Sequence, residues 1–255
     1  MNPILQIENL KKSFGGVVAT DGCSLEVFPG QIHAIIGPNG AGKTTLLAQL
    51  SGELFSDSGR ILLRGADISH APIHQRVAAG MMRSYQITNL FKSLSVLQNL
   101  ALAVQSRTGH SFSMFRSVAS EHQLESESVA IAQRIGLDDE LHSLVGTLSH
   151  GKQRVLELGL LLACGANLLL CDEPTAGTDP EESQRMGDLI QSLRGDHTII
   201  LVEHDMDAVF RLADRISVLV SGKVIFTGTP DAVRKHPDVI QAYLGQDTEG
   251  VSHHE

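Results

Sequence analysis

Apolar runs alternate with stretches of helical periodicity along most of the chain. Three runs are apolar at nearly every position, which is the pattern of parallel strands buried on both faces, and they lie at 32–36, 167–171 and 198–202. A stretch with helical periodicity follows each run, at about 43–50, 181–194 and 205–213. Strands that alternate with helices predict an α/β core built on a parallel sheet.

The start of the chain has a different pattern. Short β-like runs at 5–7 and 24–27 are separated by the turn signal Gly15-Gly16. A second pair of short strands is expected around 59–68, and a hairpin around 216–226. The runs at 5–7 and 24–27, with the turn between them, predict an antiparallel β region ahead of the parallel core.

From about residue 95 to residue 162 the pattern changes to helical periodicity with few β-branched clusters. A serine-rich patch at 106–128 lies inside this stretch. The sequence therefore predicts a helical insertion between the strands of the core.

Composition places the chain among ordinary soluble globular proteins. Hydrophobic residues make up 42% and charged residues 19%, which excludes disordered and collagen-like classes. The formal net charge of -9 argues against a nucleic-acid surface, because such surfaces use clustered Lys and Arg to neutralise phosphates. No run reaches about 18 apolar residues, and residues 1–20 lack a signal-peptide pattern, so we expect a cytoplasmic protein. Cys23, Cys164 and Cys171 lack metal-ligand spacing and are interpreted as small apolar fillers.

Residues 37–45 carry the strongest chemical signal. Gly37, Gly42, Lys43 and Thr44 match the phosphate-loop pattern G-x-x-x-x-G-K-[ST] between a predicted strand and a predicted helix. Small residues let backbone N–H groups close around phosphate oxygens, and the following helix directs its N-terminus at the same anion. We expect Lys43 to reach the terminal phosphates and Thr44 to ligate Mg²⁺. The predicted nucleotide-binding residues here are Gly37, Pro38, Asn39, Gly40, Ala41, Gly42, Lys43, Thr44 and Thr45.

Two carboxylates, Asp172 and Glu173, close the apolar run at 168–171, at the expected C-terminal edge of a strand. Because neighbouring strand residues face opposite ways, Asp172 is expected to face the metal, directly or through water, while Glu173 faces the terminal phosphate. Glu173 is therefore the candidate general base for the attacking water.

Two further polar residues lie next to predicted strands. Gln86 ends a short β-like stretch just before the helical insertion. His204 follows the run 198–202, so it is expected at the same sheet edge as Asp172, where its imidazole is able to donate to a γ-phosphate. A solvated glutamine and a helix-capping or solvated histidine are the alternatives.

Residues 148–154 precede an apolar helix predicted at 155–163. The helix start, with Ser149 and the backbone of Gly151, is a second place suited to an anion. Either the chain binds two ligands, or the second start contacts a nucleotide held mostly by another copy.

These segments together resemble the ATP-binding-cassette family over nearly the whole chain. In chain order, the matching segments are the Walker A segment 37–45, Gln86 of the Q-loop, the signature 148–153, the Walker B segment 168–173, the D-loop 176–179 and the switch histidine His204. The resemblance implies ATP and Mg²⁺ as ligands, Gln86 in catalysis and metal binding, and Asp179 in nucleotide binding. It also implies that Phe14 stacks on adenine, a contact worth about 0.5–1.5 kcal/mol, with a core phenylalanine as the alternative.

The resemblance further implies an α/β fold with a RecA-like P-loop NTPase core, an antiparallel β subdomain and an inserted α-helical subdomain. Residues 1–255 are expected to form one nucleotide-binding domain, with a catalytic core at approximately 1–86 and 164–255 and a helical subdomain at approximately 87–163. Cassettes of this family pair head to tail, as two identical or two different chains. The resemblance therefore implies that Ser149 and Gly151 of one cassette cover the ATP bound to the other. The resemblance also implies transmembrane permease subunits, which use the cycle of ATP binding and hydrolysis at the cytoplasmic face of the membrane.

The signature departs from the common family pattern at His150, where Gly is usual, and at Lys152, where Gln is usual. Features similar to the branched-chain amino acid uptake subgroup, with its urea and amide relatives, are His150 and the segments 14–16, 172–177, 202–206 and 242–245. That subgroup also uses a soluble solute-binding protein as an indirect partner.

Three other functions share parts of this pattern. An exporter cassette of the lipopolysaccharide type would carry every catalytic motif but usually has a Gly-Gly signature. A non-transport ATPase switch acting on ribosomes or DNA typically carries two cassettes or long coiled-coil arms. A small-molecule kinase would keep residues 37–45 but has no need of residues 148–154 or His204.

Overall fold

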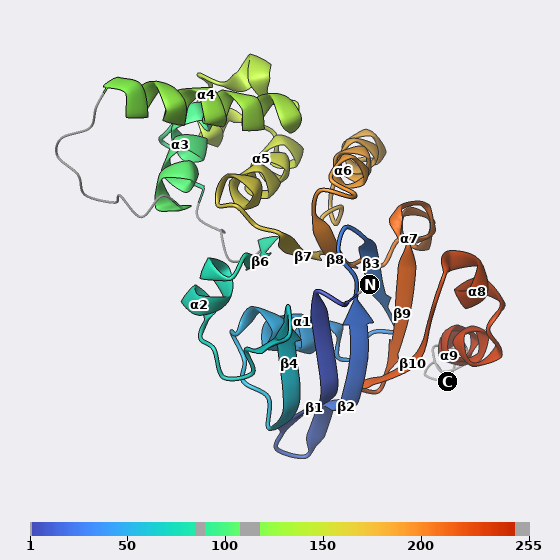
Figure 1. Cartoon of the computed structure of the whole chain (residues 1–255). Coiled ribbons are helices and arrows are strands. Elements are labelled where there is room, and N and C mark those ends of the chain that lie inside the picture. Colours follow the sequence, from blue (N-terminus) through green and yellow to red (C-terminus); the bar gives the residue numbers. More distant parts are fainter. Residues whose placement is uncertain (1, 85–89, 108–117, 248–255) are drawn as a thin grey trace.

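The computed structural model of the chain describes residues 2–84, 90–107 and 118–247. Gln86 and residues 108–117 of the serine-rich patch lie outside the described residues. The described part forms two sheets, and three helices lie together beyond one edge of the larger sheet (Figure 1).

The larger sheet confirms the predicted α/β core. Its strands are β3 (Ile32–Ile36), β6 (Met81–Arg83), β7 (Leu168–Asp172), β8 (Thr198–Val202), β9 (Arg215–Val220) and β10 (Lys223–Gly228). They lie in the order β10-β9-β3-β8-β7-β6, and all neighbours are parallel except the β9–β10 hairpin. Alternate residues of β7 enter different hydrophobic clusters, Leu169 and Cys171 in one, Leu168 and Leu170 in the other. Burial on both faces is the reason that these runs are apolar throughout.

The smaller sheet confirms the predicted antiparallel start. It has the order β2-β1-β4-β5 and consists of β1 (Leu5–Phe14), β2 (Val17–Val27), β4 (Ser58–Leu63) and β5 (Ala66–Asp67). Strands β1 and β2 continue to the Gly15-Gly16 turn and are much longer than the runs predicted at 5–7 and 24–27. Lys11 and Lys12 make the outer half of β1 polar, so hydrophobicity did not reveal its full length. The outer half of β2 begins with the exposed Val17 and Val18 and shows no alternation of apolar and polar residues.

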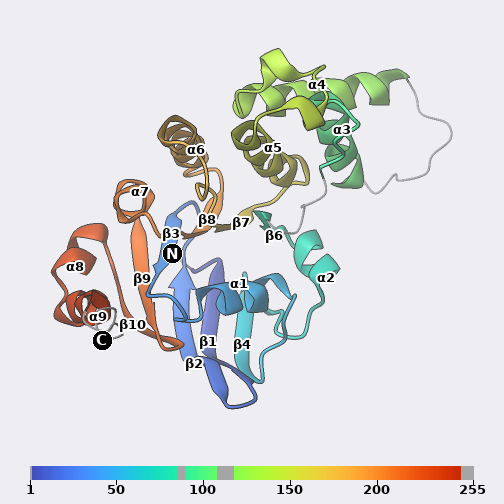
Figure 2. The same ribbon diagram turned by 180° about the vertical axis from the view of Figure 1, so that it is seen from behind.

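Helix α1 (Lys43–Ser51) lies between the two sheets (Figure 2), with Leu46, Leu47 and Leu50 buried in the cluster that also holds β1 and β7 residues. Arg76 of α2 (Ile73–Ala78) binds its C-terminal end. The Arg76 Nη1 atom donates to Gln49 O at 2.6 Å and to Leu50 O at 2.7 Å, and the residue is 1% exposed. Because the last carbonyls of a helix have no partner inside it, this buried guanidinium fixes the end of the phosphate-loop helix.

The helical insertion consists of α3 (Val96–Arg107), α4 (Val118–Arg134) and α5 (His150–Ala163), with short 3-10 turns at Asp138–Glu140 and Val145–Thr147. Helices thus occupy the predicted region, although α5 begins earlier than the predicted residue 155. The cause is a cap at Ser149, whose Oγ accepts from the Lys152 N–H at 3.2 Å. None of the helices in the described part of the chain is long and apolar enough to span a bilayer.

The remaining helices are α6 (Pro180–Ser192), α7 (Met206–Leu212), α8 (Pro230–Lys235) and α9 (Pro237–Asp247). Val209, Val233 and Val239 of α7, α8 and α9 pack with β9 residues in a third cluster. The C-terminal helices are therefore anchored on the β9–β10 side of the core.

Candidate active site

The phosphate loop joins β3 to α1, as predicted. A methyl group added to Gly37 would overlap Leu219 O, and one added to Gly42 would overlap Ala19 O. Gly42 also has a φ of 102°, which side-chain-bearing residues rarely adopt. These glycines are required by close packing on β2 and β9 as well as by any phosphate, a reason that the sequence pattern alone did not contain.

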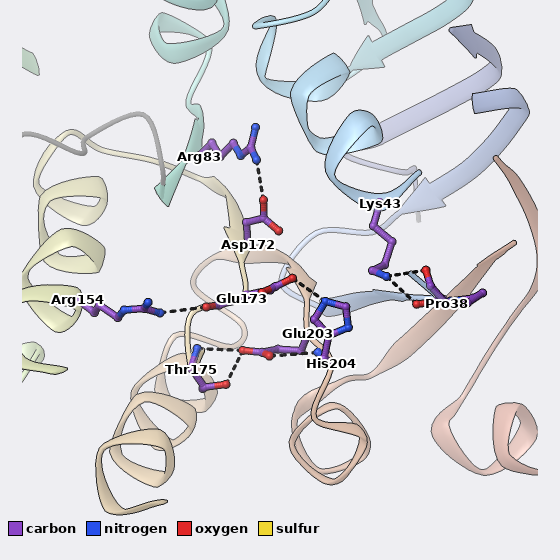
Figure 3. A network of polar contacts seen from close by, with 10 residues as sticks. Pro38, Lys43, Arg83, Arg154, Asp172, Glu173, Thr175, Glu203 and His204 are labelled. Atoms are coloured by element: carbon purple, nitrogen blue, oxygen red, sulfur yellow. Dashed lines mark hydrogen bonds and ion pairs between the residues drawn. The ribbon is translucent and has the colours of Figure 1, made fainter. Parts of the chain in front are cut away.

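Lys43 is the first residue of α1, and its side chain reaches back to the phosphate loop. Its Nζ donates to Gly37 O at 2.6 Å and to Pro38 O at 3.0 Å, and the residue is only 6% exposed (Figure 3). Burial lowers the pKa of Lys43, while the negative charges of Glu173 and Asp172 oppose that shift. The loop carbonyls and these two carboxylates therefore hold an ammonium at the start of α1.

Asp172 is the last residue of β7, and its carboxylate is held by an arginine of the neighbouring strand β6. Arg83 Nη2 donates to Asp172 Oδ2 at 2.6 Å, and Nη1 donates to Glu53 Oε2 at 2.7 Å. The Arg83 side chain is 6% exposed and that of Asp172 11%, whereas that of Glu53 is 36% exposed, so these are charge-assisted contacts at the margin of the core. Sequence reasoning missed Arg83, although a cation that ends an apolar strand run is a signal for a buried carboxylate partner.

Glu173 follows the strand with a φ of 48°, so the alternation of strand side chains ends at Asp172. The predicted reason for the opposite orientation of the two carboxylates was therefore wrong, because Glu173 is no longer in β conformation. Its N–H donates to Val202 O at 2.8 Å, and its Oε1 lies 2.6 Å from His204 Nε2. Figure 3 shows Asp172 directed toward Arg83 and Glu173 toward His204.

Two residues that the sequence analysis did not select hold the loop after Glu173. Glu203 is 5% exposed, and its Oε1 accepts from the Thr175 N–H at 3.0 Å and from Thr175 Oγ1 at 2.6 Å. Arg154 of α5 donates through Nη1 to Glu173 O at 3.1 Å and to Pro174 O at 3.2 Å. The loop is thus fixed from β8 on one side and from α5 on the other.

A cleft of about 540 Å³ lies between these elements. Its lining includes Thr44, Asp172 and Glu173 from the core and His150, Gln153, Arg154 and Glu157 from α5. Burial raises the pKa of Glu157, and the charge of Arg154 opposes the shift. Thr44 and Asp172, whose side chains both offer oxygen ligands, therefore line the same cleft.

These two groups fit a magnesium ion that is shared with a nucleotide. Mg²⁺ is commonly bound by one or two protein oxygens together with water and substrate phosphates. Among the described residues there is no group of three or more His, Cys, Asp or Glu side chains suited to a metal.

Other predicted site residues lie away from the cleft lining. Phe14 at the end of β1 is 51% exposed, with Lys12 Nζ 5.7 Å from its ring centroid, so it is not a core residue. Asp179 caps α6, and its Oδ1 accepts from the Glu182 N–H at 2.8 Å. Ser149 and Gly151 begin α5 and contact Glu182 of α6. The structure thus brings Thr44, Asp172, Glu173 and His204 together but leaves these four residues outside that group.

The two unusual signature residues have different surroundings. His150 is exposed and lines the cleft. The Lys152 Nζ pairs with Glu140 Oε1, and the hydrogen bond from Lys152 is the main cause of the lowered pKa of Glu140. Lys152 therefore connects the start of α5 to the 3-10 turn Asp138–Glu140.

Comparison with known proteins identifies the family. The family model for the ABC transporter matches residues 20–176, a segment that contains the phosphate loop, the signature and both carboxylates. The chain belongs to the ABC transporter family. A second model, described as the branched-chain amino acid ATP-binding cassette transporter, matches the cassette at residues 223–249. The resemblance to this family, and to that subgroup, is thus confirmed.

Individual relatives agree with this assignment. The cassette is 38% identical to the high-affinity branched-chain amino acid transport ATP-binding protein LivG of Escherichia coli, covering 96% of this chain and 98% of LivG. It is 34% identical to a probable LivG of Archaeoglobus fulgidus, with 96% and 97% covered. The crystal structure of an ATP-binding cassette of an ABC transporter in its ADP conformation superposes with a TM-score of 0.83 at 27% identity, covering 96% of this chain and 100% of that one. The predicted P-loop NTPase fold is confirmed, and the cassette is an ATPase that binds adenine nucleotide.

Proposed function

We propose that this cassette drives the uptake of branched-chain amino acids, or of related small amides such as urea. The match of residues 223–249 to the branched-chain amino acid model carries the proposal, because this segment lies outside the catalytic motifs that all cassettes share. It contains β10, α8 and α9. The names of LivG of Escherichia coli and of BraF of Pseudomonas aeruginosa, at 38% and 36% identity, support the same cargo class.

In the proposed reaction, Glu173 is the general base that takes a proton from the water attacking the γ-phosphate. His204 Nε2 donates to Glu173 Oε1 at 2.6 Å and orients that carboxylate, and it exchanges this partner for an oxygen of the γ-phosphate. Lys43, now bonded to two loop carbonyls, exchanges those partners for phosphate oxygens. Gln86, outside the described residues, is proposed to join the metal and the water to the helical insertion.

Thr44 and Asp172 are proposed to hold Mg²⁺, with Gln86 as a further ligand. The cation supplies charge neutralisation for the phosphates when it is bound. Arg83 keeps one oxygen of Asp172 occupied, which leaves the other oxygen for the metal or its water. Phe14 is proposed to stack on the adenine, because its ring is exposed at the end of β1.

We further propose that two cassettes, identical or different, pair head to tail. Ser149, Gly151 and Asp179 of one would then contact the ATP bound to residues 37–45 of the other. ATP favours the paired state because it contacts both cassettes only there, and hydrolysis removes that difference in affinity. Permease subunits at the cytoplasmic face of the membrane convert the cycle into transport, and a solute-binding protein delivers the cargo.

The first test measures transport. The cassette, its permease subunits and the soluble binding protein are reconstituted in liposomes, and ATP-dependent uptake of labelled leucine and of urea is measured. We expect uptake of one of these solutes. ATP-dependent movement only in the outward direction would favour the exporter alternative instead.

The second test addresses the chemistry in the same liposomes. Glu173→Gln should lower ATP turnover by about 10²–10⁴-fold, the usual contribution of a general base, while ATP affinity is retained. Glu181→Gln, an equal charge change on the exposed first turn of α6, is the control. Unchanged turnover in Glu173→Gln would exclude Glu173 as the base.

In the purified cassette, Ser149→Arg should keep ATP affinity but prevent ATP-driven pairing, and pairing that persists would exclude the contact from Ser149 to the partner's ATP.

A further inference from the structure

A carboxylate already lies on the start of α5 in the single cassette. Helices α5 and α6 are neighbours (Figures 1 and 2), and Glu182 in the first turn of α6 reaches across to the signature. Ser149 Oγ donates to Glu182 Oε1 at 3.1 Å. A methyl group on Gly151 would overlap the Glu182 carboxyl group, so the absence of a side chain at Gly151 makes room for this carboxylate.

The surroundings of this carboxylate are those that a phosphate oxygen would use. The first turn of α5 contains no acidic residue, so the negative charge at this helix start comes from another helix. Ser149 supplies a hydroxyl donor, and the N-terminal end of α5 is electropositive because its first N–H groups point outward. Glu182 therefore makes the same kind of contact that was expected for the nucleotide of a second cassette.

Capping of α6 does not account for the position of the Glu182 side chain. Asp179 and Glu182 have the spacing of a capping box, in which the glutamate side chain would return to the N–H of the capping residue. The Glu182 N–H does donate to Asp179 Oδ1, at 2.8 Å, but the Glu182 carboxylate accepts from Ser149 instead. Among the described residues no Lys or Arg forms an ion pair with Glu182, whereas the adjacent Glu181 pairs with Arg185.

We propose that Glu182 is an autoinhibitory residue, whose carboxylate occupies the signature in the unpaired cassette and must leave before Ser149 binds the partner's ATP. The proposal rests on the head-to-tail pairing proposed above. A carboxylate and a phosphate carry like charges, so both cannot lie on Ser149 at close range without strong repulsion. Because Glu182 must first be displaced, pairing requires a higher ATP concentration. In a cassette without an ATP-loaded partner, Glu182 keeps the signature covered.

The test measures pairing in a protein that does not consume ATP. In the Glu173→Gln background, the ATP concentration at half-maximal pairing is measured by sedimentation velocity for three proteins. Glu182→Gln keeps the size of the side chain but removes its charge, and Glu181→Gln makes the same charge change one residue away. We expect Glu182→Gln to lower the required ATP concentration by about 10-fold, the effect of losing one hydrogen bond to a charged group, and Glu181→Gln to change it less than about 2-fold.

A second measurement on the nucleotide-free monomer keeps the result unambiguous. Amide hydrogen exchange of residues 150–153 should be faster in Glu182→Gln than in Glu181→Gln, because the contact with α6 weakens. Equal ATP requirements for the two variants, or a higher requirement for Glu182→Gln, would overturn the proposal. If none of the proteins pairs with ATP, then the head-to-tail association itself is wrong, and the inhibitory role of Glu182 is rejected with it.

Discussion

The buried histidine of β3 makes a measurable prediction for the stability of the core. His33 is fully buried, and its ring bridges two neighbours. The Gln31 Nε2 atom can only donate, so Nδ1 of His33 accepts from it at 3.0 Å. The other nitrogen, Nε2, then carries the proton and donates to Ser217 Oγ at 2.8 Å, and Ser217 continues to Thr227 Oγ1 at 2.7 Å. This chain of hydrogen bonds requires a neutral imidazole.

Burial lowers the pKa of His33 to about 4, and the positive charge of Arg215 on the neighbouring strand β9 adds to the shift. In the unfolded chain the pKa returns to 6.5. As the pH falls from 6.5 toward 4, the unfolded state binds a proton that the folded state does not, so stability decreases with decreasing pH. At about 1.4 kcal/mol for each pKa unit, the loss from this residue approaches roughly 3 kcal/mol at pH 4.

The measurement is urea unfolding followed by far-UV circular dichroism, since the chain has no tryptophan. Wild-type protein and His33→Gln are compared at several pH values between 7 and 4.5. The glutamine amide is able to accept and donate but does not titrate, so the variant should lose the part of the pH slope that belongs to His33. Burial also lowers the pKa of His197, and both proteins share that contribution. Equal slopes for the two proteins in this window would refute the reasoning.

Two further substitutions test contacts that position the site. Arg76→Leu should lower the free energy of unfolding by about 3 kcal/mol, because it leaves several buried carbonyls without a partner. The control Arg185→Leu removes an exposed arginine and should change the free energy of unfolding by less than about 0.5 kcal/mol. Equal losses of the two variants in urea unfolding would contradict this prediction. Glu203→Ala should lower stability by about 2 kcal/mol and reduce turnover more than ATP affinity, because Thr175 loses its acceptor and the loop carrying Glu173 loosens. Turnover and nucleotide affinity that both remain at wild-type values would show that this loop is positioned by other contacts.

The sequence predicted the elements whose signals are local. The parallel strands β3, β7 and β8 were evident because each is apolar on both faces, and the phosphate loop because its pattern lies between a strand and a helix. The antiparallel hairpin was predicted at its turn but not at its length, since the outer halves of β1 and β2, with exposed residues such as Lys11 and Val17, are held by backbone pairing rather than by burial.

In the candidate site too, some features followed from local sequence signals and others did not. Residue types and spacing selected Lys43, Asp172, Glu173 and His204. The fold places Asp172, Glu173 and His204 at the ends of the neighbouring strands β7 and β8, and Lys43 at the start of the helix that follows β3. The orientation of Glu173 did not follow from the pattern, because its positive φ ends the alternation of the strand. Backbone conformation at a strand end depends on the loop that follows, and here that loop is held by Glu203.

Local patterns in the chain were enough to predict the family motifs, the buried strands and the chemical groups available for phosphate. The partners of those groups became evident in the folded chain alone: Arg83 for Asp172 across 89 residues of sequence, Arg154 for the Glu173 carbonyl across 19, and Glu182 for Ser149 across 33. The physical reason is that hydrophobicity and turn signals act over a few neighbouring residues. A hydrogen bond between two helices or two strands depends on how sheets and helices pack, which no local pattern encodes.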